Sequence, residues 1–183
     1  MARSVSRSLL GIALFFCLPT TAQVTTGQCG YDRWPVKILN DKDHALVDLH
    51  SIDTTVATLG TIPIHEIPYP YDHRIAPKEL RVYHLKARLL RVRKEADSDL
   101  HLLLADLDQP DRRMIAEIPA PWCAERSGHE QEFKIAREAI SSIPPDTVIE
   151  IIGVGFFDFL HEQRGAAKNG IELHPVLSFH VSK

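Results

Sequence analysis

Polar and apolar side chains alternate along a run that begins near residue 80. Its apolar positions are Tyr83, Leu85, Ala87 and Leu89, and the polar positions between them are His84, Lys86 and Arg88. An alternation of period two predicts a strand with one buried face. Leu89 and Leu90 then stand side by side, and the apolar parity moves to Leu90 and Val92. A slip of one residue predicts a β-bulge at this point.

Four further strands and one helix are predicted in the second half of the chain. Apolar runs of strand length lie at 100–104, 114–118, 148–159 and 171–181. Between the second and third of these runs, apolar residues fall mostly at helical spacing: Phe133, Ile135, Ala136, Ala139 and Ile140. Pro144 and Pro145 end this helix, since proline lacks the backbone donor that a helix needs.

The resulting order is three strands, a helix and two strands. This is the order of an OB fold, a five-stranded Greek-key barrel with a helix between strands three and four. An immunoglobulin-like sandwich is the alternative, but it needs about seven strands and has no inserted helix. We therefore predict a mainly β protein whose OB-like barrel occupies residues 79–183.

Residues 23–78 are predicted to form an N-terminal arm ahead of the barrel. Prolines recur in it, at Pro35, Pro63, Pro68, Pro70 and Pro77. Because each proline removes a backbone donor, we expect no regular sheet there. One short helix is predicted from Asp53, which can cap its start, to Gly60, which suits its end.

The first 22 residues have the three-part pattern of a secretory signal peptide. Arg3 and Arg7 precede an apolar run at 9–18, and small residues around Ala22 offer a cleavage site. The run is shorter than the roughly 20 apolar residues that a membrane-spanning helix needs. We expect an exported protein, periplasmic or extracellular, without a transmembrane segment in its mature part.

The charge balance argues against non-specific nucleic-acid binding. The chain has 21 Lys and Arg against 24 Asp and Glu, and removal of Arg3 and Arg7 leaves 19 against 24, a net charge of −5. Proteins that bind nucleic acid through its phosphates usually carry a basic surplus. Cleavage would also remove Cys17 and leave Cys29 and Cys123. An even cysteine count in an exported chain predicts a disulfide between them.

Several stretches resemble a family of uncharacterised exported bacterial proteins. The main one is 153–177, GVGFFDFLHEQRGAAKNGIELHPVL, and 99–106 and 118–123 resemble the same family. The resemblance covers roughly 29–181 and implies a fold without an established activity. The chain is more distantly similar to bacterial periplasmic OB-fold proteins and to staphylococcal-type nucleases, which share its strand order. It lacks the nuclease stretches Asp-Thr-Pro-Glu and Tyr-Gly-Arg, which speaks against nuclease activity.

Candidate chemistry gathers around the loop that joins the last two strands, roughly 160–170. His161 opens this loop, and Glu172 and His174 follow it on one face of the last strand. His101, which shares a strand face with Asp99, reaches the same end of the barrel only if its strand pairs with the matching ends of the first and third strands. We predict a polar cluster of His101, His161, Glu172 and His174, held mainly by hydrogen bonds, with Asp158 and Glu172 as candidate partners of the histidines.

Two other interpretations of these residues stay open. The same four side chains could surround a divalent metal such as Zn, because imidazole and carboxylate suit borderline metals. A basic stripe could instead bind a phosphate backbone, with Phe156, Phe157 and Phe159 stacking on bases. The stripe comprises Lys86, Arg88, Arg91, Arg93, Arg112 and Arg113. A solvated barrel wall over core phenylalanines is the simpler interpretation of that stripe.

The sequence holds no recognised catalytic motif. We expect a non-catalytic binding module that takes a small ligand or a protein partner through the 160–170 loop, without a cofactor. A metal-dependent hydrolase acting at that loop is the alternative from another class, and its cofactor would be the divalent metal.

Overall fold

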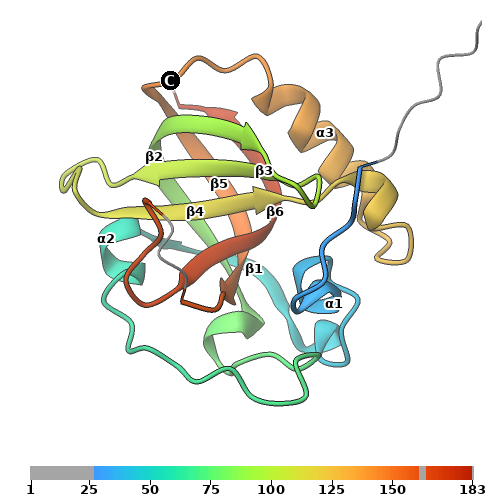
Figure 1. Ribbon diagram of the computed structural model, residues 1–183. Helices are drawn as coiled ribbons and strands as arrows, with labels where there is room; N and C mark the ends of the chain where they lie inside the picture. The colour runs from blue at the N-terminus through green and yellow to red at the C-terminus, as the bar shows by residue number, and fades with distance from the viewer. Residues whose placement is uncertain (1–26, 161–163, 183) are drawn as a thin grey trace, which may run out of the picture.

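The computed structural model describes residues 27–160 and 164–182, and the predicted signal peptide lies outside them. The strands are β1 (Asp48–Thr54), β2 (Arg81–Lys94), β3 (Leu100–Ala105), β4 (Arg113–Ile118), β5 (Thr147–Phe157) and β6 (Ile171–Val181). The helices are α1 (Trp34–Lys37), α2 (Val56–Leu59) and α3 (Glu130–Ile140). Short 3-10 turns, η1 (His44–Leu46), η2 (Lys78–Leu80) and η3 (Pro121–Cys123), complete the elements (Figure 1).

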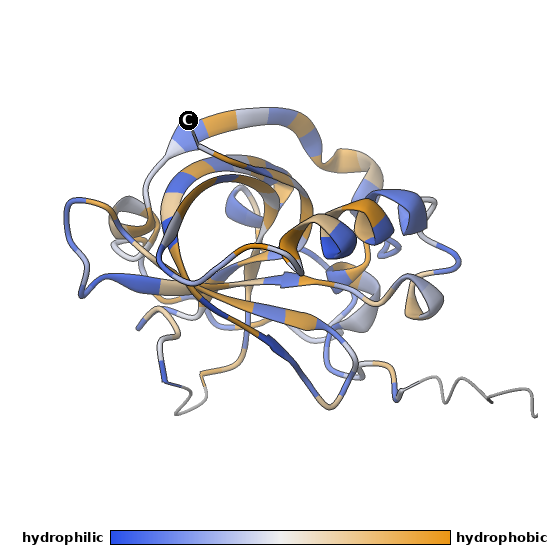
Figure 2. Ribbon diagram, turned by 90° about the horizontal axis from the view of Figure 1, so that it is seen from above, coloured by the Kyte–Doolittle hydropathy of each residue, from blue (hydrophilic) through white to orange (hydrophobic). Residues whose placement is uncertain are grey.

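Strands β2 to β6 close into a five-stranded barrel, and the prediction of an OB-like, mainly β fold is confirmed. The sheet order is β1-β2-β3-β4-β6-β5, and a further pairing between β2 and β5 closes the ring. Barrel neighbours are antiparallel except β4 and β6, which run parallel at Ile115 and Glu172. Figure 2 shows the strands curling around the interior. In the chain, α3 lies between β4 and β5, the third and fourth barrel strands.

The predicted bulge in the first barrel strand is also present. Leu89 pairs with Leu104 and Arg91 pairs with Leu103, so Leu90 is the extra residue. The first half of β2 therefore pairs with β5, while the second half bends over to β3. A bulge increases local bend and twist, which a small closed barrel needs.

The inward faces of the strands and one face of α3 make the core. Leu85, Leu89, Leu102 and Leu104 are fully buried, and they pack in one cluster with Phe133, Ala136 and Ile140 of α3. Full burial of a side chain such as Phe133 stabilises the fold by about 1.5–3 kcal/mol relative to exposure. The helix thus closes one end of the barrel.

The N-terminal arm departs from the sequence prediction in two respects. The expectation that it forms no regular sheet is wrong, because β1 pairs in parallel with β2. Leu49 and Ile52 of β1 are exposed, so the strand lacks the alternation of polar and apolar residues that indicates a buried face. The predicted short helix is present but begins later, after Thr55, whose side chain accepts a bond from the amide of Thr58.

The predicted disulfide joins the arm to the barrel. Cys29 and Cys123, which are 94 positions apart in the sequence, are bonded, with their Cα atoms 5.5 Å apart. Closing a loop of this length stabilises a fold by about 4–5 kcal/mol on the loop-entropy model. Within the described residues, no helix combines the length and the apolar character needed to cross a membrane.

Candidate functional site

The outer wall formed by β3, β4 and β6 carries the polar residues that the sequence singled out. Alternate side chains of a strand share a face, so His101 and Leu103 of β3 point away from the core. His101 pairs with Glu117 across β3 and β4, and Ile115 pairs with Glu172 across β4 and β6. The register therefore brings these polar side chains to one wall.

Four side chains on this wall form a buried cluster, which we call the histidine–carboxylate cluster: Asp99, His101, Glu117 and His174. His174 Nδ1 lies 3.1 Å from one Glu117 oxygen, and His101 Nδ1 lies 3.2 Å from the other. His174 Nε2 lies 3.4 Å from Asp99 Oδ2. The carboxylates next to the histidines are thus Glu117 and Asp99, which corrects the expectation of Asp158 and Glu172.

The acids in and beside the cluster differ in the direction of their pKa shifts. Burial alone would raise the pKa of Glu117, but the close contacts with His101 and His174 hold the pKa well below its usual range. Burial raises the pKa of Asp99 despite the contact with His174. Burial, and then the charges of Glu117 and Asp158, raise the pKa of the neighbouring Glu172 well above its usual value. Glu117 is therefore the acid that stays ionised most readily.

The arm covers part of this wall. Lys37 of α1 is buried with its Nζ 5.4 Å from the centre of the Phe156 ring, and that ring contacts His174 edge-on. Burial opposes the charged form of Lys37, but Asp158 and then Glu117 raise its pKa above the ordinary value. The cluster therefore sits between the barrel and the arm rather than in open solvent.

The structure brings three of the four predicted site residues to this wall. His101 and His174 share Glu117, and Glu172 lies two positions before His174 on β6. His161 lies outside the described residues. Sequence reasoning missed Glu117, although a lone acid within the apolar strand 114–118 was a signal that a buried partner exists.

A second site, which we call the rim pocket, opens at the other end of β4. It has a volume of about 320 Å³. Its walls are α2 with Gly60, the hairpin residues 111–113, and residues 165–168 of the loop between β5 and β6. Arg113 and Glu117 share a face of β4 four positions apart, so the pocket and the cluster lie about 13 Å apart at 3.3 Å per residue.

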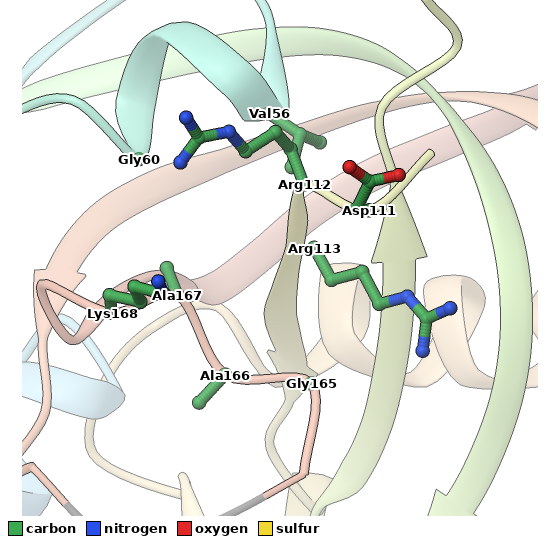
Figure 3. A pocket seen from close by; sticks show the side chains of 9 residues that line it. All are labelled: Val56, Gly60, Asp111, Arg112, Arg113, Gly165, Ala166, Ala167 and Lys168. Atoms are coloured by element: carbon green, nitrogen blue, oxygen red, sulfur yellow. The ribbon is translucent and has the colours of Figure 1, made fainter. Parts of the chain in front are cut away.

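Cationic side chains dominate the rim pocket. Figure 3 shows Arg112 and Lys168 on opposite walls, with the guanidinium of Arg113 turned away from Lys168. Among the described residues that line the pocket, Asp111 is the one acid. Arg112, Arg113 and Lys168 are exposed, and in the described part of the chain their side chains make no ion pair or hydrogen bond. Positive charge without a partner thus gathers in a chain of negative net charge.

Hydrogen bonds to α2 hold the walls of the rim pocket together. Asp106, at the start of the β3–β4 hairpin, accepts a bond from the amide of Ala57 at 2.8 Å. Asn169 donates to the carbonyl oxygens of Leu59 and Ile62, each at 2.9 Å. The hairpin and the 164–170 segment are therefore both anchored to one short helix, and the pocket is preformed.

The proposed stacking phenylalanines lie elsewhere. Phe156 and Phe157 are buried, and Phe159 is half-buried with its ring edge-on to Tyr71. Arg88 and Arg91 of the basic stripe lie on β2 at the barrel surface. Two of the three candidate aromatic rings are thus not exposed for base stacking.

No family model and no curated protein matches the chain. Matching solved structures include one assigned to aspartyl-tRNA synthetase from Leishmania major Friedlin, with a TM-score of 0.45 and 12% identity over 74% of this chain and 21% of that one. Another is the asparaginyl-tRNA synthetase of Entamoeba histolytica, with a TM-score of 0.42 and 11% identity over 72% and 24%. The chain spans about a quarter or less of these structures. The likeness concerns the fold, and no activity is inferred from it.

Proposed function

We propose that this chain is an exported, non-catalytic OB-fold binding module that takes a small anionic ligand in the rim pocket. One observation carries the proposal: Arg112 and Lys168, from two separate segments, face a shared open pocket without an acidic partner in the described residues. The loop between the last two barrel strands is one of the places where OB folds bind ligands.

The chemistry of the pocket favours phosphate, sulfate or carboxylate groups. Arginine presents donors in a fork that matches such anions, and lysine adds a point charge. A pocket of about 320 Å³ is at the small end of ligand sites, so it suits a small molecule. The mature chain's expected net charge of −5 disfavours a long polyanion, which would meet the acidic remainder of the surface.

The hydrolase alternative finds less support. A catalytic metal needs an open coordination position for water or substrate. The side chains of His101, His174 and Asp99 are at most 1 % exposed, and the arm lies over the wall that carries them. A metal held by side chains this deeply buried would have no open position for a substrate. The export part of the proposal rests on the N-terminal pattern and on the Cys29–Cys123 disulfide, which is typical of oxidising compartments.

Titration of the mature protein with inorganic pyrophosphate, followed by amide NMR shifts at 0.15 M NaCl, tests the proposal. Saturable shifts confined to residues 109–113 and 165–168 are expected. Random single-stranded DNA serves as the comparison probe, and we expect no micromolar binding of it at this salt. Absence of any pyrophosphate shift, or shifts along β2 instead of the rim pocket, would refute the assignment.

A further inference from the structure

We propose that Asp99, Glu117 and His174 form a structural site for a divalent metal of the zinc class, buried between the barrel wall and the arm. This site is independent of the anion pocket. Its three side chains come from three places in the chain: the residue before β3, the end of β4 and the middle of β6. A metal here would join three barrel strands.

The positions of the donor atoms support the site. One ligand atom from each of Asp99, Glu117 and His174 lies within 4.8 Å of the others. The side chains of Asp99 and His174 are fully buried, and that of Glu117 is 11 % exposed. Structural metal sites are closed in this way, whereas catalytic sites keep a position open.

A second observation concerns hydrogen bonding. Asp99 Oδ2 and both ring nitrogens of His174 are buried, and within the described residues they make no hydrogen bond of acceptable geometry. His174 Nε2 lies 3.4 Å from Asp99 Oδ2, and His174 Nδ1 lies 3.1 Å from Glu117 Oε2. Both are ion-pair distances, but the angles do not suit hydrogen bonds. Buried polar atoms without hydrogen bonds are costly. A cation bound by Asp99 Oδ2 and one ring nitrogen of His174 would supply the missing partner of those two atoms.

The donor set suits a borderline divalent cation. It offers one imidazole nitrogen and one oxygen from each of two carboxylates, which are ligands that zinc and similar metals accept. The carboxylates are themselves supported: Ala120 donates its amide to Asp99 Oδ1 at 3.2 Å, and His101 Nδ1 lies 3.2 Å from Glu117 Oε1. Such outer partners orient the ligands of metal sites.

Charge balance leaves one competing arrangement. The two carboxylates need positive charge, and either a divalent cation or a proton on His174 together with Lys37 can provide it. In the first case the protein binds one metal ion and loses stability without it. In the second case metal has no effect. The two arrangements therefore differ in the number of metal ions bound per chain, one or none, which can be measured.

The test unfolds the full mature chain in guanidinium with chelator and refolds it with or without Zn²⁺. Metal content by mass spectrometry and the thermal midpoint are then measured. We expect one Zn²⁺ per chain and a higher midpoint in the zinc-refolded protein. Asp99→Asn and His174→Gln should each lower zinc affinity at least about tenfold, as is typical of the loss of one ligand or supporting group.

A matched control distinguishes this site from surface binding. His84 and His180 flank Glu150 on the exposed barrel wall, at 3.5 and 3.0 Å. The double variant His84→Gln/His180→Gln should keep the bound zinc. The proposal is overturned if wild-type protein refolds equally well without zinc and binds none, or if zinc is lost in this control and kept in Asp99→Asn. Because the wild-type comparison needs no variant, misfolding of His174→Gln does not block the test.

Discussion

The carboxylate of Asp106 accepts a hydrogen bond from the backbone amide of Ala57 across 49 residues of sequence, at 2.8 Å. This bond fixes the start of α2 against the start of the β3–β4 hairpin. A second Asp106 oxygen accepts bonds from the amides of Asp108 and Gln109, each at 3.1 Å. One buried acid therefore shapes the hairpin that carries Arg112 and attaches it to the neighbouring wall of the rim pocket.

Replacement of Asp106 by alanine should lower the free energy of unfolding by about 1–2 kcal/mol, because it leaves helix and hairpin amides without an acceptor. Burial alone would raise the pKa of Asp106, but the amides of Ala57, Gln109 and Asp108 lower it below its ordinary value. The stabilisation is then fully present above the unfolded pKa of about 3.9 and is lost as pH falls through the lower folded pKa.

Urea unfolding of wild type and Asp106→Ala at several pH values measures this effect. The difference between the two proteins should be largest at pH 6–7 and should shrink below about pH 4, where the unfolded carboxyl protonates. A difference that stays constant down to pH 2, or that grows there, would contradict the assigned role of the Asp106 charge.

Gly165 determines how closely the 164–168 segment approaches β3. Its φ is +95°, and an added Cβ would lie 2.3 Å from Leu103 Cδ1. Gly165→Ala should therefore be destabilised by both backbone strain and overpacking. Gly128 is the matched control, since its φ is +75° and nothing lies within 4 Å of an added Cβ. We expect Gly165→Ala to cost about 1–3 kcal/mol more than Gly128→Ala.

Thermal or urea unfolding of the two glycine variants measures this difference, and pyrophosphate titration gives the second readout. Gly165→Ala should bind the anion more weakly, because Lys168 would shift with its segment, while Gly128→Ala should bind like wild type. Equal stability and equal affinity of the two variants would show that the contact with Leu103 does not position the pocket wall.

The buried ion pair between Arg33 and Glu79 anchors the arm. Two guanidinium nitrogens of Arg33 lie 2.7 and 2.8 Å from the two carboxylate oxygens of Glu79. Glu79 also accepts hydrogen bonds from the backbone amides of Ile75 and Phe157, each at 2.6 Å. Removal of one partner leaves a buried charge alone, which typically costs about 3–5 kcal/mol. Glu79→Gln should therefore be strongly destabilised.

The exposed pair Arg81–Asp48 provides the comparison, with an N–O distance of 2.8 Å and both side chains more than 40 % exposed. Asp48→Asn should cost at most about 1 kcal/mol, the usual value of surface pairs. Chemical denaturation of both variants checks the contrast. Similar small losses in the two proteins would mean that the arm is not held by Arg33 and Glu79.

The barrel was predictable because its signals are local. Alternation along 83–89 and the slip at Leu89–Leu90 reflect which side chains are buried, and the structure has both the strand and the bulge. Strand β1 escaped prediction because it is held by backbone bonds at the sheet edge, with Leu49 and Ile52 left in solvent. Hydrophobic pattern does not record such a strand.

The site was harder to predict because its members meet only through register. His101 and His174 could be named from their strands, but Glu117 joins them through a pairing that the sequence does not state. The rim pocket depends on Asp106 and Asn169, which reach α2 from 49 and 110 residues away. The basic stripe in the sequence included Arg112 and Arg113, but not Lys168, which lines the same pocket from the loop.

The dissociation constant of pyrophosphate for Arg112→Gln/Lys168→Gln, measured by calorimetry at 0.15 M NaCl, tests the central claim most directly. The control is Arg91→Gln/Lys134→Gln, which removes the same charge from exposed positions on β2 and α3. Charged hydrogen bonds contribute about 1.5–3 kcal/mol each, so the pocket variant should bind at least about tenfold more weakly, while the control binds like wild type. Equal weakening in both variants, or no weakening in either, would contradict an anion site in the rim pocket.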